Sequence, residues 1–203
     1  PSYGANSPTK FNVATLVNDQ TNITLDYAKD LDVNWSSHPL TVSAGVAYRH
    51  EQYRLEAGDY DSYSYGGIDN VQVGAVQASG LTPDDAGTFK RDVGGVYFGL
   101  ENQVTDKLQV GVAGRTEHYS DFGSATTGKL SARYDFTPQV ALRGTINNAY
   151  HAPSLGQVGT SWTTTTNLDV NGNPVLTRML PADNPAARAL GAQPLKPEKS
   201  TNY

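Results

Sequence analysis

Charged side chains recur at alternate positions of several extended segments, and they are the first candidates for chemistry in this chain. They are Arg49, Glu51, Glu101, Arg115, Glu117, Arg133 and Arg143. Because alternate residues of a β-strand lie on the same face, these side chains would line one polar surface. Two hypotheses stay open. The charges contact a second polypeptide surface, or they form a solvated or mutually paired ladder, in which a cross-strand pair of opposite charge is worth only about 0.2–1 kcal/mol.

Aromatic side chains among hydroxyl groups form the second candidate. Residues 58–67 read GDYDSYSYGG, which places Tyr60, Tyr63 and Tyr65 between serines and glycines, and Trp162 lies in a later polar stretch. Rigid amphipathic rings gain contact area at low entropic cost, so they suit a sugar or an aromatic iron chelate as ligand. The alternative is that these rings pack against neighbouring loops.

The histidines and carboxylates show no catalytic pattern. His50, His118 and His151 fall towards the same ends of their strands, where imidazoles either ligate iron or haem or form ordinary surface hydrogen bonds. The sequence signatures of serine hydrolases, zinc proteases and phosphate-binding loops are missing. We therefore expect no enzyme, no metal site and no cofactor.

Residues 169–173 begin like a calcium-binding loop, but the pattern fails further on. Pro174 and Leu180 stand where such a loop needs a turn glycine and a bidentate glutamate. The Asn-Gly pair at 171–172 instead predicts a hairpin turn.

Alternation of apolar and polar residues defines the elements that would carry these groups. In residues 22–35, for example, Ile23 and Leu25 share a face with Trp35, and aspartates occupy the other face. The alternation predicts strands at 22–35, 39–54, 92–104, 107–120, 125–136 and 138–150, and the start of another near 198. A run of such strands is typical of a β-barrel wall between lipid and a polar lumen. Such a wall would place Trp35 and Phe136 in the aromatic girdle on the inward-facing side of the membrane, with Tyr134 just above them.

The connections alternate in length. Tight turns are expected at 36–38, 105–106 and 137, a short link at 121–124, and long Gly- and Pro-rich loops at 55–91 and 151–197. Short turns at one rim and long loops at the other are the arrangement of outer-membrane barrels. Residues 1–21 are interpreted as the tail of another outer loop.

Composition sets outer bounds. The chain has 203 residues, of which 37% are hydrophobic, with a net charge of −5 and no cysteine. No stretch approaches the roughly 20 apolar residues of a spanning helix, whereas a spanning strand needs only about 9–11 residues, apolar at every second position. Singly scattered Lys and Arg argue against a nucleic-acid partner. Without cysteine, no disulfide or thiolate metal site is available.

Three stretches carry a more specific resemblance. Residues 115–136 read RTEHYSDFGSATTGKLSARYDF, residues 137–155 continue as TPQVALRGTINNAYHAPSL, and residues 195–203 read LKPEKSTNY. In this order and spacing they resemble the C-terminal half of the barrel of TonB-dependent outer-membrane receptors. The chain departs from that pattern at 150–153, where it reads YHAP instead of the usual FRAP, and the Asn-Pro-x-Leu segment of haem-uptake members does not follow.

The resemblance implies an antiparallel, up-and-down transmembrane β-barrel of about twenty-two strands, of which this chain would supply roughly six or seven. Residues 55–91 and 151–197 would be long extracellular loops. A plug domain and a TonB box, through which the TonB–ExbB–ExbD system acts, would lie outside these residues, so we interpret the chain as an internal piece of a longer protein. The resemblance further implies the outer membrane of a Gram-negative bacterium, with lipid as one partner and lumen charges that face the plug.

The expected function is active uptake of a scarce small-molecule ligand, with a ferric siderophore first and an oligosaccharide or cobalamin as alternatives. A hypothesis from a different class is a secreted all-β binding module with two packed sheets. That module would bring Leu25, Val42, Val110 and Leu142 together in a dry interior, whereas a barrel wall would turn them towards lipid.

Overall fold

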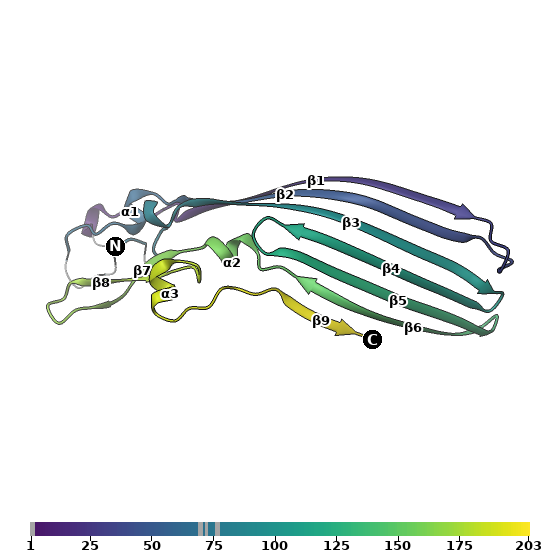
Figure 1. Ribbon diagram of the computed structural model, residues 1–203. Helices are drawn as coiled ribbons and strands as arrows, with labels where there is room; N and C mark the ends of the chain where they lie inside the picture. Colours follow the sequence, from purple (N-terminus) through teal and green to yellow (C-terminus); the bar gives the residue numbers. More distant parts are fainter. Residues whose placement is uncertain (1–2, 69–70, 72, 76–77) are drawn as a thin grey trace. The chain divides into compact units, whose positions relative to one another are not determined.

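The main element of the fold is a seven-stranded sheet with the order β1-β2-β3-β4-β5-β6-β9 (Figure 1). The computed structural model describes residues 3–68, 71, 73–75 and 78–203. The strands of this sheet are β1 (Ala14–Leu31), β2 (Leu40–Ala57), β3 (Gly87–Thr105), β4 (Leu108–Tyr119), β5 (Gly123–Thr137), β6 (Val140–His151) and β9 (Glu198–Asn202). The pairs β3–β4, β4–β5, β5–β6 and β6–β9 are antiparallel, which confirms the predicted up-and-down order.

The remaining elements are short and lie in the connections. They are η1 (Gly4–Asn6), α1 (Tyr60–Tyr63), η2 (Pro83–Asp85), α2 (Leu155–Gly159), β7 (Trp162–Leu168), β8 (Pro174–Met179) and α3 (Pro185–Ala189). In the described part of the chain, no helix is both long and apolar enough to cross a membrane.

The β7–β8 hairpin confirms the turn predicted from Asn-Gly. The two strands pair antiparallel. Gly172 has a φ of 81°, a left-handed conformation that glycine adopts without a Cβ clash. The Asp169 carboxylate accepts hydrogen bonds from the backbone N–H groups of Asn171 and Asn173, both at 2.8 Å. Asp169 therefore stabilises the turn. Its pKa is lowered, mainly by the hydrogen bond from the Asn173 side chain and also by those from the backbone N–H groups.

Two expectations about the N-terminal part are wrong. The first strand begins at Ala14, so residues 14–21 are not the tail of a loop, and it ends at Leu31, so Trp35 lies in the following turn. Residues 14–21 mix polar groups on both faces and gave no alternation signal. Pairing with β2 uses backbone groups, which carry no such signature in the sequence.

The long loops are shorter than predicted. β2 continues to Ala57 and β3 already begins at Gly87, so the first loop covers 58–86 and not 55–91. The second connection, 152–197, contains the β7–β8 hairpin and two of the short helices.

The register assigns apolar and polar residues to opposite faces. Leu100 pairs with Val112, Val112 with Leu130 and Leu130 with Ile146, so one apolar row crosses four strands. A second row, three residues away along each strand, contains Gln103, Gln109, Arg133 and Arg143 in the same pairing. Successive residues of a strand point to opposite sides, so the two rows lie on opposite faces. We call these the apolar face and the polar face of the sheet.

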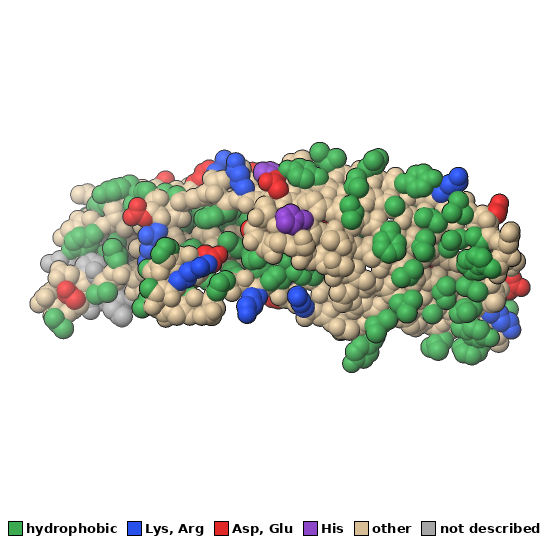
Figure 2. Space-filling view, in the orientation of Figure 1, with side chains coloured by type: hydrophobic (Ala, Val, Ile, Leu, Met, Phe, Trp, Pro, Cys, Tyr) green, Lys and Arg blue, Asp and Glu red, His purple; other side chains and the backbone are tan. Residues whose placement is uncertain are grey.

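The apolar face is open. Leu25 is 71% exposed and Leu142 is 66% exposed, while Val42 and Val110 are half-buried. Figure 2 shows apolar side chains spread over this part of the surface. Among the described residues no second sheet covers these side chains, so the dry interior required by a two-sheet module is absent there.

The chain divides into two compact units. The loop unit comprises Pro1–Asp19, Glu51–Lys90 and Ser154–Leu195, and the wall unit comprises Gln20–His50, Arg91–Pro153 and Lys196–Tyr203. The buried apolar side chains of the loop unit are Leu55, Val73, Ala75, Leu81 and Leu155. The wall unit buries Val93 and Tyr119.

Candidate functional site

The polar face of the wall unit contains a hollow lined by charged side chains. A cavity of about 470 Å³ is bounded by Glu101, Lys129, Arg133 and Arg143, with Gln109 beside them. The Gln109 side-chain amide donates a hydrogen bond to Glu101. Cations therefore outnumber the carboxylate in this hollow, which suits an acidic partner surface or an anionic ligand.

Two arginines of this face pair with carboxylates of their own strands. Arg133 donates to Asp135 at 2.8 and 3.0 Å, two residues further along β5. Its cross-strand neighbour is Arg143, a like charge, so a cross-strand ion pair is not possible at that position. Arg115 likewise donates to Glu117 at 2.6 Å within β4. Arg115 and Arg133 therefore pair within their own strands, and the register places both on the polar face.

A second cluster lies nearer the loop ends of the strands. The Arg115 guanidinium stacks on the Tyr97 ring at 5.5 Å, and the Tyr119 hydroxyl donates to Glu117 at 2.9 Å. Arg49 shares a cavity of about 160 Å³ with Arg115 and Glu117. The structure thus brings Arg49, Arg115 and Glu117 together, as the alternation predicted.

Glu51 has the same parity on β2 as Arg49 but belongs to the loop unit. It is half-buried.

Arg91 is a buried cation that the sequence analysis missed. It is 3% exposed, and its Nε donates to both carboxylate oxygens of Asp121 at 3.0 and 2.8 Å. Its guanidinium also donates to the Pro153 carbonyl at 2.8 Å and stacks on the Phe122 ring at 5.1 Å. The YSDFG and HAPS segments, which carried the family resemblance, therefore converge on one arginine. Their shared role in this chain is to hold the loop ends of β3, β4 and β6 together.

The tyrosines of 58–67 divide into exposed and half-buried rings. Tyr60 is 69% exposed and Tyr65 is 43% exposed, whereas Tyr63 is half-buried. Tyr60 and Tyr63 meet edge to face, with ring centroids 5.7 Å apart. Tyr60 and Tyr65 thus leave part of their rings exposed to solvent, and Tyr63 packs against Tyr60.

The serines between these tyrosines form the core of the loop. Ser62 is fully buried, and its carbonyl accepts hydrogen bonds from the backbone N–H groups of Ala75 at 2.9 Å and Gly80 at 2.8 Å. A Cβ at Gly80 would lie 1.8 Å from the Ser62 hydroxyl oxygen, so only glycine fits there. The sequence analysis used the Tyr and Ser residues of this segment only to predict exposed rings. The serines between the tyrosines were the signal for the buried Ser62 and Ser64.

Asp85 links the two long loops. Its side chain is fully buried and accepts hydrogen bonds from Ser161 Oγ at 3.0 Å and Thr163 N at 3.0 Å, and forms a salt bridge with Arg178 Nε at 3.1 Å. Thr82 Oγ1 in its own loop donates at 2.8 Å. The carboxylate of one loop thus holds the β7–β8 hairpin of the other.

The same contacts orient Trp162. The side chains of Ser161 and Thr163 both bind Asp85, so they lie on one side of β7. Trp162, between them, points to the opposite side. It is half-buried.

Hydrogen bonding keeps Asp85 ionised. Burial by itself would raise the pKa of this carboxyl, but hydrogen bonds from Thr82, Thr163 and Ser161 outweigh it and lower the pKa below the ordinary aspartate value.

The histidines have separate partners. His50 Nδ1 lies 2.7 Å from Asp92 Oδ1, and His118 Nδ1 lies 3.0 Å from Ser124 Oγ. His151 is exposed. Over the residues that the structure describes, no three His, Asp or Glu side chains gather as a metal site would require.

Two comparisons with known proteins agree with this architecture. A family model described as TonB dependent receptor-like, beta-barrel, matches residues 1–203. Among solved structures, the chain is similar to the siderophore receptor PirA from Acinetobacter baumannii, with a TM-score of 0.58 and 17% sequence identity. The match covers 92% of this chain and 24% of the PirA chain, so this chain spans about a quarter of that protein's length.

Proposed function

Because the chain belongs to the β-barrel family of TonB-dependent receptors, we propose that it supplies part of the wall and two extracellular loops of an outer-membrane receptor that imports a ferric siderophore. In this proposal the loops capture the ligand. The TonB–ExbB–ExbD system then displaces a plug domain and opens the lumen.

The two-faced sheet is the observation that carries the proposal. On the apolar face Leu130 is 56% exposed and Ile146 is 50% exposed. Contact of these side chains with water is unfavourable in free energy, and contact with lipid is not. The opposite face carries the charged hollow of Lys129, Arg133 and Arg143. A wall between hydrocarbon and a polar lumen accounts for both faces at once.

The lumen charges are proposed to contact the plug. Arg133 and Arg115 are already held by carboxylates of their own strands, and the exposed Arg143 stands opposite Arg133 in the β5–β6 pairing. Solvated charges exchange partners at a cost of about 1 kcal/mol or less per pair. Such a surface lets a plug bind and shift without a large barrier.

The loops are proposed to present a rigid ligand surface. Asp85 joins the 58–86 loop to the β7–β8 hairpin, and Ser62 fixes the backbone that displays Tyr60. Preorganised aromatic side chains lose little entropy on binding, which favours tight capture of a dilute ligand. Tyr60, Tyr63, Tyr65 and Trp162 are the proposed ligand contacts.

The choice of a siderophore is supported by the similar receptor, which is named for a siderophore, and by aromatic loop side chains that suit an aromatic chelate. The same side chains also suit a sugar, so an oligosaccharide is the second candidate.

Uptake measurements test the proposal. The full-length protein that carries this chain, expressed in a host without its own siderophore receptors, should take up radiolabelled iron from a panel of ferric siderophores and should need TonB. Trp162→Ala should reduce uptake, while Trp35→Ala, in a turn at the other end of the strands, should not. Uptake of labelled oligosaccharide or cobalamin without any siderophore would contradict the ligand, and recovery of soluble protein without detergent would contradict the receptor.

A further inference from the structure

The hollow on the polar face of the wall unit holds two arginines in direct opposition. Arg133 of β5 pairs with Arg143 of β6, and like charges directly opposite one another in an antiparallel pair are destabilising. Asp135 compensates Arg133 at 2.8 Å. Arg143 has no carboxylate within salt-bridge distance in the part of the chain that the structure describes. An anion bound between the two guanidinium groups would therefore remove their repulsion.

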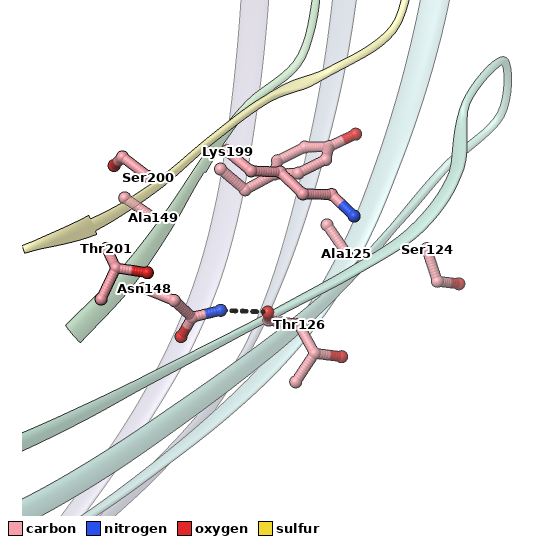
Figure 3. Close-up of a pocket in the computed structure, with 9 residues that line it drawn as sticks. Ser124, Ala125, Thr126, Asn148, Ala149, Lys199, Ser200 and Thr201 are labelled. Atoms are coloured by element: carbon pink, nitrogen blue, oxygen red, sulfur yellow. Dashed lines mark hydrogen bonds between the residues drawn. The ribbon is translucent and has the colours of Figure 1, made fainter.

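The register that opposes these arginines is fixed at both ends. The strands β5 and β6 pair from the tight turn at Thr137 to Lys129. Beyond Lys129 they separate, and the Asn148 side chain bridges them (Figure 3). Its Nδ2 donates to the Thr126 carbonyl at 3.0 Å, and its Oδ1 accepts from the Gly128 N–H at 2.6 Å. A slip of the register would break this bridge and the turn, so the two arginines stay opposed.

Small and hydroxyl-bearing residues form the floor of the hollow. Gly111 has no side chain, and a Cβ there would lie 2.9 Å from the Ser131 hydroxyl oxygen. Thr145 pairs with Ser131 across the strands and lines the same cavity. Its volume of about 470 Å³ is within the usual range of about 300–1,000 Å³ for small-molecule sites. The hollow therefore has room for an anionic group of a ligand and hydroxyl groups to contact it.

The charges around the hollow favour an oxygen-rich anion. Lys129 lines it and, among the described residues, has no carboxylate within salt-bridge distance. The Glu101 carboxylate also lines it and accepts a hydrogen bond from the Gln109 side chain. A planar guanidinium binds an oxyanion through two parallel hydrogen bonds, and an ammonium adds a compact positive charge. A neutral ligand would leave both of these charges uncompensated.

The hollow is separate from the proposed ligand contacts of the loops. Tyr60 and Trp162 belong to the loop unit, whereas the hollow belongs to the wall unit. Arg133 lies in the half of β5 that ends at the tight turn at Thr137. In the proposed receptor the tight turns face the inner side of the membrane. The plug would cover this half of the lumen at rest, and its displacement would expose the hollow to the ligand.

We propose that the hollow is a transit site, which binds an anionic ferric chelate with carboxylate or catecholate oxygens as it passes through the lumen. Arg133, Arg143 and Lys129 bind these oxygens, and the hydroxyl groups of Ser131 and Thr145 contact the remainder. The inference rests on the proposed function and names the charge of its substrate. An anionic siderophore is held on the way to the inner side, and a neutral one is not.

The test compares uptake of an anionic ferric tris-catecholate and a neutral ferric trihydroxamate by the full-length receptor, in a host without other siderophore receptors. The wild type should favour the anionic chelate. Arg143→Gln should lower the maximal uptake rate of that chelate about tenfold, as expected for one lost charge-assisted hydrogen bond. Arg143→Glu should lower it further, and Arg143→Lys should keep most of it. Lys107→Gln, an exposed cation of the tight turn outside the hollow, should keep the wild-type rate.

Binding to cells without TonB separates transit from capture. Because the loops capture the ligand, each Arg143 variant should keep the wild-type Kd for the anionic chelate in these cells. A Kd that rises as much as the uptake rate falls would assign Arg143 to the capture site and would overturn the transit site.

Charge reversal keeps the test independent of folding. Arg143→Glu places a carboxylate opposite Arg133, a stabilising cross-strand combination, so the variant should fold, and heat-dependent gel mobility checks this. Wild-type uptake in Arg143→Glu, or an equal loss in Lys107→Gln, overturns the inference. A new leak of a large antibiotic in Arg143→Gln would show that this arginine holds the plug, and overturns it too. A wild-type receptor that takes up the neutral chelate as fast as the anionic one refutes the transit site alone, whereas one that takes up no siderophore refutes the proposed function as well.

Discussion

Replacement of Asp85 by asparagine should release the β7–β8 hairpin from the 58–86 loop. The Asp85 carboxylate accepts hydrogen bonds from Thr82, Ser161 and Thr163 and pairs with Arg178, and its side chain is fully buried. Asparagine keeps one acceptor oxygen but turns an NH₂ group towards these donors. The Ser161 hydroxyl and the Thr163 N–H then lose their charged acceptor, and each such donor left unsatisfied costs about 1–3 kcal/mol.

Hydrogen exchange measures this release directly. A loss of about 3 kcal/mol corresponds to roughly a hundredfold faster exchange through opening of the hairpin. Amides of residues 162–179 should therefore exchange much faster in Asp85→Asn, while those of β4 and β5 should be unchanged. Asp84→Asn is the matched control, because the Asp84 side chain is exposed. Arg178 donates a hydrogen bond to the backbone carbonyl of Asp84, which the substitution leaves in place.

The same coupling predicts a pH dependence. Because the folded-state pKa of Asp85 is lowered, its stabilisation is fully present above the unfolded value of about 3.9 and is lost as the pH falls through the lower folded value. Hairpin protection in the wild type should therefore hold at pH 5 and fall steeply below about pH 4. In Asp85→Asn this dependence should vanish. Equal exchange in the wild type and Asp85→Asn, or equal loss in Asp84→Asn, would refute the reasoning.

Arg91→Met should destabilise the folded barrel by about 3–5 kcal/mol, because it leaves the Asp121 carboxylate without its partner. Unfolding in denaturant measures this loss of stability. The double variant with Asp121→Asn should recover part of it. Leu130→Arg should make the free energy of folding into the membrane about 2–4 kcal/mol less favourable for a position near the bilayer midplane. Ser131→Arg, one residue along and on the polar face, should assemble normally, and equal defects would contradict the assignment of faces. Trp162→Ala should weaken ligand binding by about 2 kcal/mol, seen as roughly a thirtyfold higher Kd in a fluorescence titration; an unchanged Kd would remove Trp162 from the site.

The strands were predictable where one face of the sheet is consistently apolar and the other consistently polar. From Leu40 to Ile146 the alternation that lipid and water impose on a strand is strong, and the strands appear within a few residues of their predicted places. At residues 14–21 each side of the strand mixes apolar and polar residues, so no alternation revealed the strand. The Asn-Gly pair at 171–172 predicted its hairpin because the left-handed turn has few residue solutions.

The sequence predicted which face of the sheet the charged residues of the candidate site occupy, but not which residues they contact. The parity of Arg133 placed it correctly on the polar face, yet its ion pair depends on the register, which set it opposite Arg143. Asp85 and Arg91 were missed because their importance comes from contacts with segments distant in sequence: Asp85 binds Thr163, and Arg91 binds Pro153. No local spacing marks such a contact.

Spin-label accessibility along β5 tests the central claim most directly. These 203 residues contain no cysteine, so in a full-length receptor with any other cysteines replaced, a single cysteine at each of positions 129 to 134 carries the only label. In the membrane-embedded receptor, labels at 130, 132 and 134 should be relaxed by lipid-soluble oxygen, and labels at 129, 131 and 133 by a water-soluble nickel complex. The same response at both parities, or protection of both from either reagent, would contradict a wall with lipid on one face and water on the other.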